Sequence, residues 1–144
     1  MLSHRTPSCV SPSVPERIAP VAPSLVVVAG VLLPWVRVSP AHEGPVISIY
    51  HSGMGSGLEL PHGLVLVPTV LLLSALSLAG YRYRRGELVV GAVGALAVGW
   101  FIQSWQGTFI AGPGTWVTLA GCLFLTAVAA IGLYRRRKRV KSTA

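Results

Sequence analysis

The stretch from Leu88 to Tyr134 contains no Asp, Glu, Lys, Arg or His, and five basic residues follow it directly. A helix needs about 20 apolar residues to cross roughly 30 Å of hydrocarbon, so this stretch is long enough to cross a bilayer twice. The 144 residues are 52% hydrophobic and only 11% charged, which is too apolar for an ordinary soluble domain of this length. The sequence therefore predicts an integral membrane protein.

Four apolar runs predict four membrane-spanning helices. We expect the spans at about residues 20–38, 62–81, 88–105 and 116–134, with outer loops at 39–61 and 106–115. Glycines and a proline between Gln106 and Thr115 break the longest run and place the last turn. The predicted fold class is an all-α membrane protein, in which residues 24–134 form a four-helix transmembrane bundle with a short outer cap loop.

The positions of the basic residues predict the orientation of this bundle. All but one of the twelve lysines and arginines fall on one side of the four predicted spans, and Arg37 falls on the other. Short loops rich in Lys and Arg stay in the cytoplasm. We therefore expect a multi-pass protein of the cell membrane with both termini cytoplasmic. Residues 1–23, rich in proline, predict a disordered tail, and residues 135–144 predict a basic tail.

All four tryptophans fall in the outer half of this arrangement, which is typical of aromatic rings that anchor a protein at the membrane interface. They are Trp35, Trp100, Trp105 and Trp116.

A cleaved signal peptide is the alternative for the first span. Ser39-Pro40-Ala41 follows the apolar run and imitates a cleavage site with small residues. The long upstream tail and the proline inside the site favour a retained span.

Small residues at four-residue spacing predict close packing of the third and fourth spans. Gly91, Ala95 and Gly99 would line one ridge, and Thr118, Cys122 and Thr126 would line the facing one. We expect an antiparallel helix pair that Gly99→Leu would disturb.

The predicted outer loop carries His42, Glu43, His51 and Glu59, which are residue types that bind divalent metals. Their spacing matches no metal motif, so they are weak candidates and we expect no metal or other cofactor. The β-branched residues of 45–50 predict a short strand in the same loop.

Basic residues next to the predicted spans have two interpretations. They can bind acidic lipid head groups, or they can act only as signals that fix the topology. Either interpretation explains the high pI better than nucleic acid binding does, because the charges border apolar runs. The residues are Arg82, Arg84, Arg85, Arg135, Arg136, Arg137, Lys138 and Arg139.

Several short segments together give a resemblance to a known set of proteins. They are Leu33–Val36, Gly44–Tyr50, Ser52–Met54 and Pro113–Gly121. With them, residues 24–134 resemble small four-span membrane proteins of unknown function from archaea, notably halophiles, and related prokaryotes. The resemblance implies a four-span fold and supplies no activity.

Apart from Arg37 at the outer end of the first one, the predicted spans contain no Asp, Glu, Lys or Arg, which disfavours a proton-coupled carrier. No catalytic constellation can be assembled from the remaining residues, so we expect no enzyme activity. The sequence favours a non-enzymatic accessory or scaffold component, whose partners are the lipid bilayer and other membrane proteins or copies of itself. A small homo-oligomeric passive channel or carrier is the alternative, and an outward-facing metal or ligand sensor is a weaker one.

Overall fold

The computed structural model describes residues 17–41, 43, 55–81, 83–104 and 109–141. This part of the chain is mostly helical. Its elements are α2 (Val21–Leu32), β1 (Val36–Val38), the short 3-10 helix η1 (Gly57–Glu59), α3 (Pro61–Leu78), α4 (Arg84–Ser104), β2 (Phe109–Ala111) and α5 (Pro113–Lys141).

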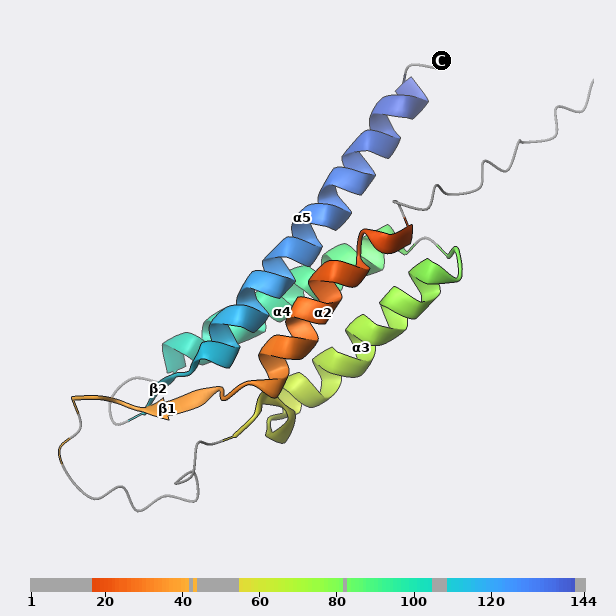
Figure 1. Cartoon of the computed structure of the whole chain (residues 1–144). Helices are drawn as coiled ribbons and strands as arrows, with labels where there is room; N and C mark the ends of the chain where they lie inside the picture. The colour runs from red at the N-terminus through yellow and green to blue at the C-terminus, as the bar shows by residue number, and fades with distance from the viewer. Residues whose placement is uncertain (1–16, 42, 44–54, 82, 105–108, 142–144) are drawn as a thin grey trace, which may run out of the picture.

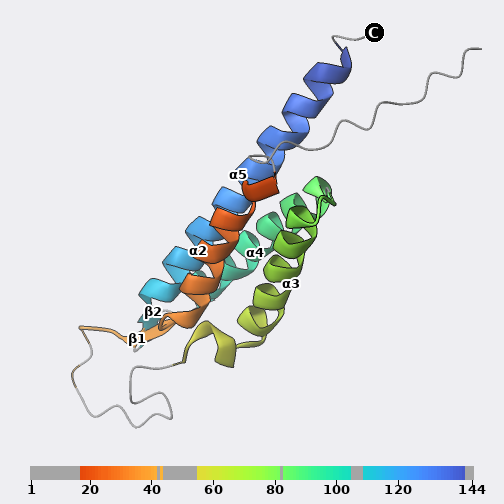
Figure 2. The same cartoon turned by 45° about the vertical axis from the view of Figure 1, so that its right-hand side comes forward.

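The helices form a bundle in which each one packs against its neighbours along the chain (Figure 1). Helix α5 lies against both α4 and α2, and α3 lies against α2 and α4. Successive helices run in opposite directions, so α2 begins at the end of the bundle where α5 leaves it (Figure 2). Between them lies an apolar core that includes Val27, Val31, Val70, Val98 and Leu125.

Within the described residues, three helices are long and apolar enough to cross a membrane: α3, α4 and the part of α5 from Pro113 to Lys138. Helix α2 has 12 residues and is therefore only about 18 Å long. The membrane crossing predicted at residues 20–38 is therefore not confirmed. Pro34 explains the early end of α2, because a proline disfavours helical backbone at the residue before it, and Leu33 is extended with ψ 161°.

Helix α5 continues through the predicted basic tail. Residues 135–141 are helical, and the 29-residue helix is about 43 Å long, so its last turns extend past the other helices. The predicted basic tail is therefore helical at these seven positions. Arg and Lys are good helix formers, and they interact favourably with the negative end of a helix dipole.

The two loops predicted to be outer ones carry structure that the sequence did not predict. Strand β1 pairs antiparallel with β2, with Val36 opposite Ala111 and Val38 opposite Phe109. The predicted strand at 45–50 lies outside the described residues. Trp35 immediately precedes β1 and has no exposed surface, so the prediction that it anchors at the membrane interface is wrong. Trp105 is also outside the described residues, whereas Trp100 and Trp116 are exposed.

Candidate functional site

Basic side chains gather at the end of the bundle that contains the start of α4 and the last turns of α5. A groove of about 930 Å³ lies there between the two helices. Six of its lining residues are cationic, and two are tyrosines. The lining consists of Tyr83, Arg84, Arg85, Gly86, Leu133, Tyr134, Arg136, Arg137, Lys138 and Lys141.

Helix geometry explains why these residues of α5 share the groove. At 100° per residue, Leu133, Arg137 and Lys141 fall on one face of α5. Arg135 points away from the centre of this face and does not line the groove. Arg139 belongs to α5, but its side chain is not among those that the structure describes, and Arg82 lies outside the described residues.

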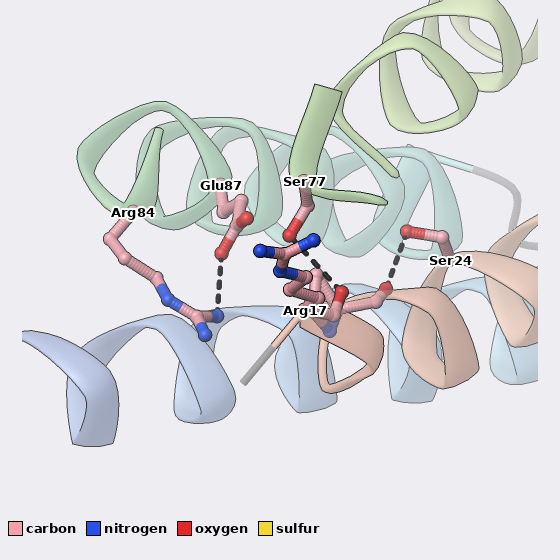
Figure 3. A network of polar contacts seen from close by, with 6 residues as sticks. Arg17, Ser24, Ser77, Arg84 and Glu87 are labelled. Atoms are coloured by element: carbon pink, nitrogen blue, oxygen red, sulfur yellow. Dashed lines mark hydrogen bonds and ion pairs between the residues drawn. The ribbon is translucent and has the colours of Figure 1, made fainter. Parts of the chain in front are cut away.

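A buried ion pair lies beside the groove. Arg84 Nη1 donates to Glu87 Oε2 at 2.9 Å, and the Glu87 side chain is 2% exposed (Figure 3). The arginine side chain also crosses towards α5, since a Cβ built on Gly132 would lie 3.2 Å from Arg84 Nε. The pair therefore holds one guanidinium between the two walls of the groove.

The first described residues of the chain lie at the same end of the bundle. Ser77 Oγ donates to the carbonyl oxygen of Arg17 at 3.2 Å, and Ser24 Oγ donates to that of Pro20 at 2.8 Å (Figure 3). Arg17 Nε is buried and has no hydrogen-bond partner among the described residues. Charged groups from α4 and from the segment before α2 are thus brought close to the C-terminal turn of α3.

Glu87 is a residue that sequence reasoning missed. The third span was predicted to begin at residue 88, but α4 begins at Arg84 and includes Glu87 as a buried residue of its first turns. An Arg three residues before a Glu was the available signal, because residues at that spacing are neighbours on a helix surface.

The predicted packing ridge of α4 is displaced in the structure. A Cβ on Gly91 would lie 2.5 Å from Thr126 Oγ1, and one on Gly94 would lie 2.9 Å from Cys122 Sγ. Ala95 is only partly buried, and a Cβ on Gly99 would meet nothing within 4 Å. The prediction is therefore wrong for Gly99, and the close contact continues at Gly94.

A second close helix contact, between α2 and α5, was not predicted. A Cβ on Gly30 would lie 2.5 Å from the backbone nitrogen of Thr118, and one on Gly121 would lie 2.8 Å from that of Val27. Thr118, assigned by the prediction to the α4 contact, instead faces α2.

The weak metal candidates are not brought together where the structure describes them. Glu43 and Glu59 are exposed, and His42 and His51 lie outside the described residues. In the described part of the chain, no group of three or more His, Cys, Asp or Glu side chains is placed to hold a metal ion.

Comparison with known proteins gives no relative for this chain: no family model, curated protein or solved structure matches it. The groove and the ion pair are therefore interpreted from their own chemistry.

Proposed function

We propose that this protein is a multi-pass component of the cell membrane that acts as a non-enzymatic accessory or scaffold. The observation that carries the proposal is the set of three apolar helices packed around a filled core. All three are long and apolar enough to lie in a hydrocarbon environment. Residues such as Leu96 and Trp100, 75% and 76% exposed, provide an outer surface that lipid or a partner helix would cover.

The threonine hydroxyl groups of α5 favour a structural role over transport. Thr118 Oγ1 donates to the carbonyl of Gly114 at 2.8 Å, and Thr126 Oγ1 donates to that of Cys122 at 2.8 Å. Thr115 Oγ1 donates to the carbonyl of Gly112 at 2.6 Å. A hydroxyl already bonded to a nearby backbone carbonyl serves packing and offers little to a passing solute.

Native mass spectrometry on the C-terminally tagged full-length protein, extracted gently from its own membrane, tests the proposal. We expect the subunit to carry a second membrane protein in a fixed ratio. A homo-oligomer whose reconstitution into liposomes produces solute flux would replace the proposal with the channel alternative. A subunit without any protein partner would also contradict an accessory role.

A further inference from the structure

We propose that the groove between the start of α4 and the end of α5 binds the phosphate head group of an anionic phospholipid. The proposal rests on the membrane location proposed above. It differs from a general attraction of basic residues to a charged surface, because it assigns the binding to one face of α5 and to the facing turn of α4.

The charge of the groove suits a phosphate. Arg84 and Arg85 line it from α4, and Arg136, Arg137, Lys138 and Lys141 line it from α5. Guanidinium groups bind phosphate oxygens through paired hydrogen bonds, and lysines add point charges. Glu87 lies close to these cations, but its carboxylate is buried and already bonded to Arg84.

The geometry of Arg84 reduces the cost of binding. Its side chain is 16% exposed, is bonded to Glu87 and lies against the backbone at Gly132. A long side chain that is already held in place loses less conformational freedom when a ligand arrives. The first turn of α4 adds the positive end of a helix dipole on the same side of the groove.

The position of the groove favours a lipid over a free anion. The apolar part of α5 ends at Tyr134, and Leu133, Tyr134 and Tyr83 line the groove together with the cations. Tyrosines are typical of the level of lipid head groups, where their rings contact apolar chains and their hydroxyls meet water. Basic pockets between membrane helices on the cytoplasmic side of a bilayer are typical head-group sites.

The test uses full-length protein in detergent, titrated with phosphatidylglycerol or with phosphatidylcholine and followed by native mass spectrometry. We expect tighter binding of phosphatidylglycerol, and about a fivefold loss of that affinity in Arg137→Gln, which corresponds to about 1 kcal/mol for one basic residue near an anionic lipid. Arg135→Gln is the matched control, because it removes the same charge two positions away. It should change the affinity less than twofold.

Three results would overturn the head-group site: no preference for phosphatidylglycerol, equal losses in the two variants, or displacement of the lipid by an equal concentration of inorganic phosphate. Equal losses would mean diffuse attraction, and displacement would mean a site for a small free anion. Alkaline extraction of cell membranes separates this proposal from the previous one. A protein released by alkali contradicts the membrane location, whereas a retained protein without lipid preference contradicts only the groove.

Discussion

Gly91 and Gly99 lie on the same helix, but only Gly91 faces a neighbouring backbone. We expect Gly91→Ala to destabilise the protein by about 1–3 kcal/mol, because the added methyl group overpacks the contact with Cys122 and Thr126. Gly99→Ala is the matched control and should be neutral or stabilising by up to about 1 kcal/mol, since alanine is the better helix former. Thermal unfolding in detergent, followed by circular dichroism, measures both. Equal destabilisation would contradict the assigned face of α4.

Glu87 is the buried charged residue whose removal the structure predicts to be harmful. Glu87→Ala should destabilise the protein by about 2 kcal/mol, because it removes the buried carboxylate that accepts a hydrogen bond from the partly buried Arg84. Glu59→Ala, which removes an exposed carboxylate from η1, should change stability by less than about 0.5 kcal/mol. The same thermal unfolding assay compares them. A melting temperature that is unchanged in Glu87→Ala would show that the ion pair contributes nothing to stability.

The sequence predicted the long elements better than the short ones. Helices α3, α4 and α5 follow from apolar runs with a length close to that of a membrane crossing. The span predicted from the first apolar run was too long, because hydropathy depends only on composition, whereas Pro34 determines where the helix ends. Strand β2 was not predicted because three residues paired with a distant segment leave no periodicity of their own.

The candidate site shows a similar division. The sequence was enough to assign the basic residues to one end of the bundle. It could not show which of them line the groove and which lie on the open surface, because that depends on the helical extension of α5. The predicted packing ridge was wrong at Gly99 for a geometric reason. A strict four-residue repeat turns by about 40° at each step around a helix, so Gly99 leaves the face on which Gly91 lies. The buried face alternates steps of four and three through Glu87, Gly91, Gly94, Val98 and Phe101.

Trp35 contacts four elements at the end of the bundle where β1 and β2 lie. Its Nε1 donates to the carbonyl of Gly30 in α2 at 3.1 Å, and its ring lies 5.3 Å from that of Phe101 in α4. A Cβ on Gly57 in η1 would lie 2.5 Å from the indole, and one on Gly114 in α5 would lie 2.7 Å from it. The fully buried indole therefore fills a space that several helix ends share.

We expect Trp35→Ala to destabilise the protein by about 3–5 kcal/mol, because the elements around the indole cannot all close over the cavity. Trp100→Ala removes the same side chain from a position that is 76% exposed, so it should cost less than about 1 kcal/mol in detergent. Unfolding temperatures of the two variants in one detergent provide the comparison. A larger loss in Trp100→Ala would contradict the assignment of Trp35 to the core.

At the scale of the whole molecule, the two ends of the bundle differ in charge. Arg17, Arg84, Arg85 and residues 135–141 gather at one end, while Arg37 lies in β1 at the other (Figure 1). The backbone at the end that contains β1 is irregular but paired. Trp35 N–H donates to Gly55 at 3.1 Å, and its carbonyl accepts from Gly112 N–H at 2.7 Å. Such pairing permits non-helical backbone close to a membrane, where an unpaired group would be costly.

This difference in charge predicts that the two ends face opposite sides of the membrane. In a Cys9→Ser background, a maleimide that cannot cross membranes should label Arg37→Cys in intact cells and should label Lys138→Cys only after permeabilisation. Both positions are exposed, Arg37 in β1 and Lys138 in the basic last turns of α5, so a difference in labelling reports sidedness rather than burial. Cys122 remains as a buried internal reference.

The prediction holds although α2 is too short to cross alone, because α2 packs antiparallel to α5 and so places Arg37 at the end opposite Lys138. Labelling of both cysteines in intact cells would contradict this topology, and labelling of Lys138→Cys alone would reverse it, since lysines and arginines would then face outwards against the usual bias.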